Sequence, residues 1–294
     1  MITGMQMALI KLQEEAKNRE NLIEEKSKSE MLEKLSTKLS RYLSPQVYQS
    51  IFSGEQDVTL TSKRKKLTIF FSDIIGFTDI TDTMESEDLS NLLNDYLNEM
   101  TLIALKYGAT VDKYIGDSIM LFFGDPYSKG VKDDAIACVN MALDMNERMS
   151  FLHKKWKNSG FTKPFDVRIG IHTGYCTVGN FGSKDRLEYT IIGSSVNLAS
   201  RIESSAKPQE ILISNETQLL VSDSFECKKS KEIMLKGFKR PVSLYVVEKK
   251  IKEIEKELLD IKKNGFELSY NINELSLDDK SILKEELSSL IKNL

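Results

Sequence analysis

The sequence predicts an α+β fold in which a ferredoxin-like, split βαβ sheet is preceded by a long helix and followed by a helical extension. An apolar strand at 67–73 is followed by an amphipathic helix and then by two short apolar runs joined through a Gly-Asp turn. A second helix and an alternating strand come next, which is the order of a split βαβ unit with helices over one face of its sheet. We divide the chain into a helical segment at 1–43, a central domain at 44–248 and a helical extension at 249–294.

The composition excludes several classes of protein. Of the 294 residues, 40% are hydrophobic and 29% are charged, as in ordinary soluble globular proteins. The net charge of -3 provides no general attraction for nucleic acid. The three cysteines are widely spaced, which fits a reducing cytoplasm better than a disulfide framework or a zinc site. No stretch approaches the roughly 20 apolar residues of a membrane helix, so we expect a cytoplasmic chain, to which a sensor or membrane module could be joined upstream.

The segment 1–43 is predicted to be one long helix, because it is rich in Glu, Lys and Leu and contains no proline. Its apolar residues repeat at close to 3.5-residue spacing, at Met5, Leu9, Leu12, Ala16 and Ile23, and again in a shifted register at Leu32, Leu35, Leu39 and Tyr42. This pattern favours a parallel coiled coil with a weak centre. A single solvated helix is the alternative. Ser44-Pro45 closes the segment, because a residue before proline avoids helical geometry.

The central domain contains clear local signals for each element. A helix is expected at 86–107, where apolar residues share one face and Gly108 is the stop, and another at 132–156. DVRIGIHTG at 166–174 and LEYTIIG at 187–193 alternate as half-buried strands. A short helix capped by Ser194 or Ser195 extends through Glu203, and residues 210–249 add a strand, a short helix and two further strands.

The tail is predicted to form a separate extension. Its apolar residues step by four and three, which predicts a helix with a narrow seam through Val247, Ile251, Ile254, Leu258 and Ile261. FELSYNI alternates as a strand, and Ser276 with Asp279 resembles a capping box that opens a final helix.

Asp73 and Asp117 are the strongest candidates for chemistry. Each ends an apolar strand beside a glycine turn, where an unpaired carboxylate is costly. If the strands are neighbours, both carboxylates reach the same rim, as in magnesium sites made of oxygen ligands. The alternative is that Asp73 caps the next helix and Asp117 only serves the turn.

Weaker signals surround this pair. Ile75, Gly76, Phe77 and Thr78 offer successive backbone N–H groups at a turn, which suits phosphate. Asn197 and Arg201 are four residues apart, so an amide and a guanidinium share one helix face, unless both are simply solvated. Lys113 and Thr190 lie on two predicted strands and could recognise the edge of an adenine ring, although an ordinary exposed lysine and a strand threonine are the simpler interpretation.

Three segments together resemble a known family. FFSDIIGFT, DKYIGDSIM and YTIIGSSVNLASR are similar, in order and spacing, to the motifs of class III adenylate and guanylate cyclases. The similarity covers about 43–247, and YLSPQVYQSI resembles the lead-in segment of these domains. In the family, the positions matching Asp73 and Asp117 bind the metal ions, and the position matching Ile74 provides a backbone carbonyl. The positions matching Asn197 and Arg201 orient the ribose and stabilise the transition state.

The resemblance also bears on the choice of substrate. Lys113 matches the lysine that recognises adenine, where guanylate cyclases usually have glutamate. Thr190 differs from the aspartate of mammalian enzymes and resembles the threonine of class IIIb, several of whose members respond to bicarbonate. Lys236 lies in the strand that carries the triphosphate lysine of the family, and Lys239 is its rival.

The resemblance implies an adenylate cyclase that converts ATP into 3′,5′-cyclic AMP and pyrophosphate, with two Mg²⁺ or Mn²⁺ ions per active site. Because the family divides each site between two subunits, it also implies a homodimer with shared active sites. A guanylate cyclase, a catalytically silent nucleotide-binding module and a purely structural dimerisation module stay open as alternatives.

Overall fold

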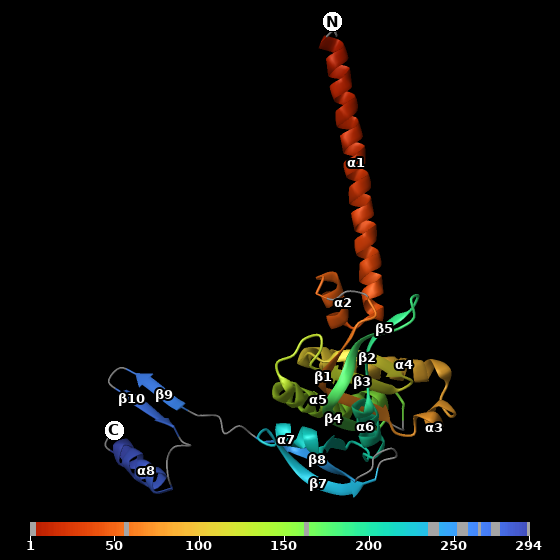
Figure 1. Ribbon diagram of the computed structural model, residues 1–294. Coiled ribbons are helices and arrows are strands. Elements are labelled where there is room, and N and C mark those ends of the chain that lie inside the picture. The colour runs from red at the N-terminus through yellow and green to blue at the C-terminus, as the bar shows by residue number, and fades with distance from the viewer. Residues whose placement is uncertain are drawn as a thin grey trace.

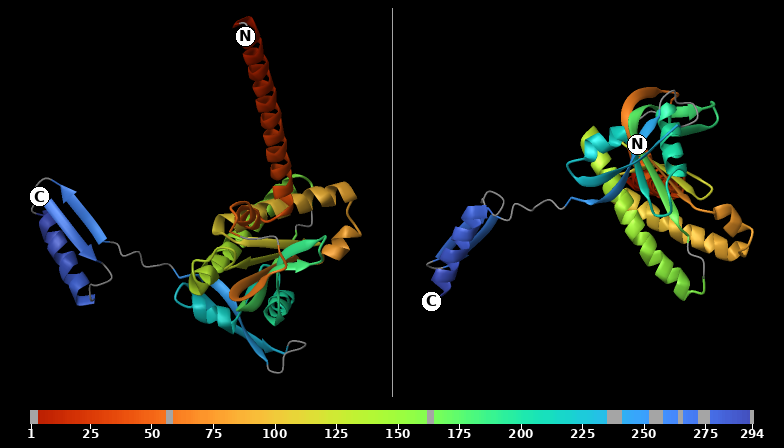
Figure 2. Two further views of the ribbon diagram at one scale, coloured as in Figure 1. Left: turned by 45° about the horizontal axis from the view of Figure 1, so that its top comes forward. Right: turned by 90° about the horizontal axis from the view of Figure 1, so that it is seen from below.

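A computed structural model describes residues 4–55, 59–161, 165–234, 241–251, 258–263, 266–271 and 277–292 (Figure 1). A body of sheet and helices carries one long N-terminal helix, and a small C-terminal hairpin and helix stand apart from this body (Figures 1 and 2). The predicted α+β class is confirmed.

The central strands form the predicted split βαβ sheet. They are β1 (Ser62–Ile74), β2 (Thr110–Ile115), β3 (Ser118–Phe123) and β4 (Val167–Gly182). Their order in the sheet is β2-β3-β1-β4, and each neighbouring pair is antiparallel. This is the strand order of the ferredoxin-like unit, so that prediction is confirmed.

Strand β4 is longer than its alternating start predicts, because its second half pairs with β5 (Leu187–Ile192). Within that half, Gly179 pairs with Ser62 of β1 on one side and with Thr190 of β5 on the other. A Cβ atom at Gly179 would lie 2.2 Å from the carbonyl oxygen of Thr61. The three strands can therefore approach this closely only because residue 179 is glycine.

Helices cover both faces of the sheet, although we expected them on one. α4 (Ser86–Tyr107) and α5 (Val131–Asn158) pack on one face, and α6 (Ser194–Ser204) packs on the other (Figure 2). The reason lies in β1, where Phe70 belongs to the core under α4 and α5 while Ile69 and Phe71 belong to the core under α6. A strand that is apolar on both sides requires cover on both sides.

The predicted helix ends are partly confirmed. Gly108 adopts a left-handed φ of 83° and ends α4, as expected. The residue before α6 is Gly193, and neither Ser194 nor Ser195 caps that helix with its side chain. Instead the Ser195 hydroxyl donates to the carbonyl oxygen of Tyr175 at 3.0 Å, which ties α6 to β4.

The far half of the sheet follows the predicted order of elements. It contains β6 (Ile211–Ser214), α7 (Asn215–Val221), β7 (Phe225–Ile233) and β8 (Val242–Lys250). The sheet continues from β4 in the order β6-β8-β7. Ser214 begins α7 by accepting the N–H of Thr217, so the strand passes into the helix without a loop.

The N-terminal segment is helical, as predicted, in α1 (Gly4–Leu39) and the 3₁₀ turn η1 (Ser40–Tyr42). The helix α2 (Pro45–Phe52) was not predicted. Its signal is Ser44-Pro45, because Ser44 accepts the N–H of Val47 and proline is favoured at the first position of a helix. Within the described residues, no helix combines the length and the apolar character required to cross a bilayer.

The C-terminal extension consists of β9 (Leu258–Lys263), β10 (Phe266–Asn271) and α8 (Leu277–Lys292). The strand at FELSYNI is confirmed over Phe266–Asn271. The helix predicted from Val247 to Ile261 is wrong at both described ends, and Ile254 and Ile272 lie outside the described residues. β8 extends to Lys250, where it pairs with Phe225, and Ile261 pairs with Leu268 in the β9–β10 hairpin. Backbone pairing at both ends of this seam thus overrides its helical spacing. Ser276 lies outside the described residues.

One imidazole lies in a buried polar row between β1, β4 and α7. The hydroxyls of Thr68 and Thr173 share a hydrogen bond of 2.9 Å, and His172 Nδ1 lies 2.8 Å from the Ser214 hydroxyl. Burial lowers the pKa of His172 to about 4, because desolvation outweighs the opposing attraction of the Glu216 carboxylate. His172 therefore has a structural role and is neutral in the folded protein near neutral pH.

This burial predicts an acid-sensitive contribution to stability. The unfolded chain binds a proton on His172 near pH 6.5, whereas the folded chain binds it only near pH 4, so the free energy of unfolding falls as the pH drops through that window. The expected loss is about 3 kcal/mol. His172→Asn keeps a polar group near Ser214 but does not titrate, so urea unfolding should show a smaller loss for this variant. Parallel pH profiles of wild type and variant would contradict this explanation.

Candidate active site

The carboxylates of Asp73 and Asp117 lie at one rim of the sheet, as the sequence predicted. Asp73 lies near the end of β1, and Asp117 lies in the two-residue turn between β2 and β3. Because β1 pairs with β3 through Ser72 and Ile119, this turn lies beside the end of β1. The N–H of Ile74 donates to Asp117 Oδ2 at 3.0 Å, which fixes the second carboxylate next to the first.

The electrostatics of this rim suit a cation. The pKa of Asp117 is raised, first by burial and then by the negative charge of Asp73. A divalent ion between the two carboxylates would favour the ionised form of Asp117. Oxygen donors of this kind are the ligands that Mg²⁺ and Mn²⁺ prefer, so the donor set fits such an ion.

Arg168 of β4 holds Asp73, and we did not predict this contact. An Nη atom of Arg168 lies 2.7 Å from Asp73 Oδ2, and its Nε atom lies 2.5 Å from Glu203 Oε1 in α6. Burial alone would lower the pKa of Arg168, but the two carboxylates outweigh it and raise the pKa. The contact follows from the strand register, which pairs Arg168 of β4 directly with Asp73 of β1.

Glu203 is buried against the sheet, with only 4% of its surface exposed. A Cβ atom at Gly170 would lie 2.1 Å from the backbone nitrogen of Glu203, so the end of α6 touches the backbone of β4. Burial raises the pKa of Glu203, and Arg168 opposes this shift. The pair of Arg168 and Glu203 thus links α6 to the strand that neighbours Asp73.

The turn after Asp73 has the geometry of a strand-to-helix connection. Gly76 has a φ of 68° and precedes the short helix α3 (Phe77–Thr81), while Phe77 packs edge-on against Phe165. The N–H of Ile75 donates to the carbonyl oxygen of Asp166 at 2.8 Å. Of the predicted phosphate contacts at 75–78, the N–H of Ile75 is therefore already used.

Asn197 and Arg201 lie on α6, which is anchored by the buried side chains of Leu198, Ala199 and Ile202. Asn197 is exposed and Arg201 is half-buried. In the described part of the chain, no hydrogen bond or ion pair joins either side chain to the two aspartates. One chain therefore presents the aspartate rim and the Asn–Arg pair as separate groups.

Lys113 and Thr190 converge on a residue that we did not predict to be important. The Thr190 hydroxyl donates to both carboxylate oxygens of Asp112, at 2.9 and 2.7 Å. Lys113 Nζ lies 3.4 Å from Asp112 Oδ1 and 2.6 Å from Glu188 Oε1. Burial lowers the pKa of Lys113, but the hydrogen bond that Lys113 donates to Glu188 and the charge of Asp112 outweigh it, so the net direction is upward.

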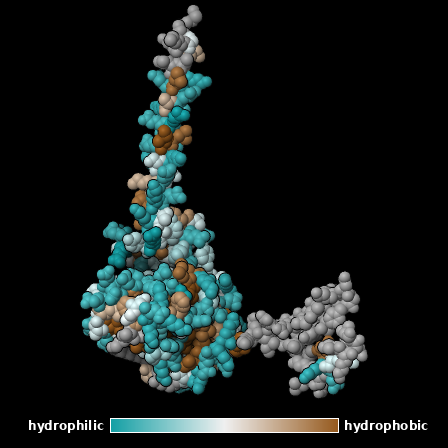
Figure 3. Space-filling view, turned by 180° about the vertical axis from the view of Figure 1, so that it is seen from behind, coloured by the Kyte–Doolittle hydropathy of each residue, from teal (hydrophilic) through white to brown (hydrophobic). Residues whose placement is uncertain are grey.

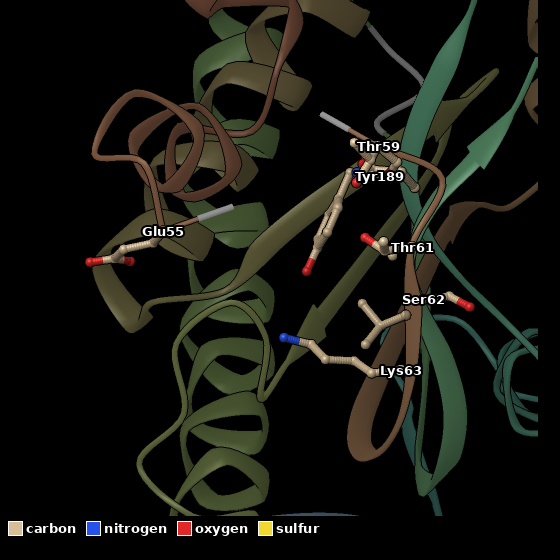
Figure 4. A pocket seen from close by; sticks show the side chains of 9 residues that line it. Glu55, Thr59, Thr61, Ser62, Lys63 and Tyr189 are labelled. Carbon is tan, nitrogen blue, oxygen red and sulfur yellow. Dashed lines mark hydrogen bonds between the residues drawn. The ribbon is translucent and has the colours of Figure 1, made fainter. Parts of the chain in front are cut away.

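The two candidates for the triphosphate lysine, Lys236 and Lys239, lie outside the described residues. A separate pocket of about 290 Å³ opens between the start of β1 and the β4–β5 hairpin (Figure 4). Lys63 and Tyr189 line it, and both bind the buried carboxylate of Asp125. None of the predicted site residues lines this pocket, so it is distinct from the candidate active site.

Comparison with known proteins agrees with the resemblance found in the sequence. Residues 60–249 match a family model described as the adenylate and guanylate cyclase catalytic domain. An adenylate cyclase of Anabaena cylindrica is 34% identical over 212 residues, which cover 70% of this chain and 40% of that protein. The chain thus spans less than half the length of this relative.

Two solved structures are also similar. The adenylyl cyclase CyaB from P. aeruginosa is 53% identical with a TM-score of 0.64, and the match covers 66% of this chain and 100% of that one. The guanylyl cyclase Cya2 is 31% identical with a TM-score of 0.63, and the match covers 67% of this chain and 98% of that one. One of these two similar structures is thus named an adenylyl cyclase and the other a guanylyl cyclase.

The contact between Arg168 and Glu203 leads to a prediction about stability. Arg168→Met keeps much of the side-chain stem but leaves Glu203 buried without a cation, which should cost about 3 kcal/mol in the free energy of unfolding. The double variant Arg168→Met/Glu203→Gln should recover most of that loss, because residue 203 then carries no buried charge. Urea unfolding at one fixed protein concentration measures the free energy of unfolding of the wild type, the single variant and the double variant. A double variant no more stable than the single one would show that the pair is not the cause.

Proposed function

The chain belongs to the adenylate and guanylate cyclase family, and we propose that it is an adenylate cyclase that converts ATP into 3′,5′-cyclic AMP and pyrophosphate. One observation carries the proposal. The carboxylates of Asp73 and Asp117 meet at the rim of the sheet, where the N–H of Ile74 fixes the second and Arg168 holds the first. A nucleotide triphosphate needs a metal-binding group of this kind beside its phosphates.

We propose that Asp73, Asp117 and the backbone carbonyl of Ile74 hold Mg²⁺ or Mn²⁺, with two ions per active site. When bound, such ions lower the pKa of the ribose 3′-hydroxyl and neutralise charge on the triphosphate. Gly76, Phe77 and Thr78 remain the proposed backbone contacts to phosphate. The assignment of Lys236 to the triphosphate stays a prediction, with Lys239 as its rival.

Asn197 and Arg201 are proposed to act on the ribose and the α-phosphate. Their spacing of four residues places both on one face of α6, and the buried residues of that helix fix its position. As the ribose 3′-oxygen attacks the α-phosphorus in line, negative charge on the phosphoryl oxygens would meet the Arg201 guanidinium. Removing one preorganised contact of this kind costs about 3 to 4 kcal/mol of transition-state stabilisation, or roughly 100- to 1,000-fold in turnover.

We further propose that two copies of the chain share each active site. Within one chain the aspartate rim and the Asn–Arg pair are separate, and each copy carries both groups. A two-fold dimer that brings the rim of one copy to α6 of the other would create two equivalent sites. The partner in this proposal is a second copy of the same chain, and the substrate is ATP.

The choice of ATP over GTP rests on Lys113 and Thr190. Lys113 can donate to a ring nitrogen, and Thr190 can accept from an exocyclic amine, as adenine requires. Guanylate cyclase is the second candidate, because the guanylyl cyclase Cya2 is also similar in structure. A module that binds nucleotide without turning it over is the third, and it would bind ATP with metal but release no cyclic product.

Helix α1 is proposed to pair with its copy as a parallel coiled coil and so to set the angle between the two domains. Its apolar side chains are exposed in the single chain, including Leu32 at 67% and Leu39 at 59% (Figure 3). Such a helix can carry a signal from an upstream module into the dimer. The other interpretation is a single solvated helix.

The direct test is the formation of cyclic AMP from ATP with Mg²⁺ or Mn²⁺, resolved by chromatography beside parallel reactions with GTP. Turnover per chain should rise with protein concentration as dimers form, and Asp73→Ala should abolish it. Arg201→Ala should lower turnover about 100- to 1,000-fold with a smaller effect on ATP binding. Near-normal turnover of Arg201→Ala would remove its proposed role.

Shared sites predict complementation between two inactive variants. In a mixed dimer of Asp73→Ala and Arg201→Ala, both substitutions fall in one site, and the other site is complete. Random equal mixing makes half of the dimers mixed, so about a quarter of wild-type activity should return. Two copies of Asp73→Ala mixed in the same way are the control. If the mixture of the two variants stayed inactive, each site would have to lie within one chain.

The α1 seam can be tested in the same assay. Changing Leu32, Leu35, Leu39 and Tyr42 to polar residues should alter basal activity, because the pairing next to the catalytic domains is lost. Lys34→Gln with Lys38→Gln, at exposed positions outside this seam, is the matched control. Unchanged activity in the seam variant would reduce α1 to a tether.

A further inference from the structure

We propose that Asp112 sets the purine preference of the site by fixing the direction in which the Thr190 hydroxyl makes its hydrogen bonds. The inference rests on the proposed function and adds a residue that positions the base-recognising group. Asp112 is not proposed to touch the nucleotide. It acts through Thr190.

A β-bulge brings Asp112 to this position. β2 pairs with β3 through Val111 and Leu121 and then through Lys113 and Met120, so Asp112 is the extra residue between two paired positions. Neighbouring residues in a regular strand point to opposite faces, whereas a bulge re-aims the side chain of the extra residue. As a result the Asp112 carboxylate and Lys113 Nζ lie 3.4 Å apart on the same side of the strand.

The groups around Asp112 are donors. Thr190 Oγ1 lies 2.9 and 2.7 Å from the two carboxylate oxygens, the N–H of Ile191 lies 3.3 Å from Oδ2, and the ammonium group of Lys113 faces Oδ1. The side chain of Asp112 is fully buried. Burial raises the pKa of Asp112, whereas these donors oppose that shift by stabilising the ionised carboxylate, which is an acceptor only.

This arrangement determines what Thr190 can offer a ligand. A hydroxyl has a single proton, and Thr190 gives it to Asp112. Only the lone pairs of Thr190 Oγ1 remain for a base, so the side chain acts as an acceptor. Without Asp112 the hydroxyl could rotate and serve as either donor or acceptor.

An acceptor at this point distinguishes the two common purines. The 6-amino group of adenine is a donor and suits Thr190, whereas the 6-oxo group of guanine is an acceptor and faces lone pairs without a proton between them. Lys113 adds to the preference, because adenine has an unprotonated N1 and guanine carries a proton there. The preferred ligand class is therefore a 6-aminopurine nucleoside triphosphate.

The variant Asp112→Asn tests the proposal, because its amide has nearly the same shape but carries both a donor and an acceptor. The ratio of kcat/KM for ATP to that for GTP should fall by about 10- to 100-fold. Thr190→Val should lower this ratio by a similar factor, whereas Thr190→Ser, which keeps the hydroxyl, should change it little. In the Thr190→Val background, adding Asp112→Asn should leave the ratio unchanged.

Two outcomes would overturn the proposal. One is an equal loss of ATP and GTP turnover in Asp112→Asn, which would assign the residue a structural role only. The other is a further change of the ratio in the double variant, which would mean that Asp112 does not act through Thr190.

A test on the wild-type protein avoids any effect of the substitutions on folding. Purine riboside triphosphate keeps N1 but lacks the 6-amino group, so its kcat/KM should fall about 10-fold or more below that of ATP. Equal values for the two nucleotides would also overturn the proposal. If the wild type forms no cyclic product from any nucleotide, the proposed function fails instead. The ratio of the dissociation constants for ATP and GTP, in wild type and Asp112→Asn, then decides the role of Asp112.

Discussion

The antiparallel register of β1 with its two neighbours is the constraint on which the candidate site depends. On one side, β3 pairs with β1 so that the β2–β3 turn places Asp117 beside Ile74, and on the other, β4 places Arg168 opposite Asp73. A shift of one residue would turn every side chain of β1 to the other face. Because β1 is buried on both faces, such a shift would disrupt two hydrophobic cores. The packing of these cores along β1 therefore fixes the position of the carboxylates at its end.

The same chain holds two groups that the proposed dimer assigns to different active sites. Asp73 belongs to the rim of one site, while Asn197 and Arg201 on α6 belong to the other. Arg168 contacts Asp73 with one nitrogen and Glu203 at the end of α6 with another. In the proposed dimer, a partly buried ion-pair network would therefore join the aspartate rim of one active site to the helix that serves the other.

Local sequence patterns predicted most of the central domain. The helix at 86–107, the Gly-Asp hairpin and the meeting of Asp73 with Asp117 were available because strong periodicity and turn chemistry agree there. The roles of Arg168, Asp112 and Glu203 could not be predicted from the sequence, because each depends on which strands are neighbours. The role of Asp112 also depends on a β-bulge that has no signature in the sequence. The helix predicted after Val247 was wrong for a related reason, since pairing with β7 and within the β9–β10 hairpin decided the outcome.

The close approach at Gly179 shortens the path between two distant parts of the sequence. This one residue pairs with Ser62, where β1 begins after α1 and α2, and with Thr190 in the candidate base-recognising hairpin. Because Gly179 has no side chain, the main chains of β1 and β5 lie close to it on either side. The start of β1 is thus joined to the strand that carries Thr190 through one residue of β4. A rotation delivered by α1 would thus reach Thr190 through the paired main chain of β1, β4 and β5.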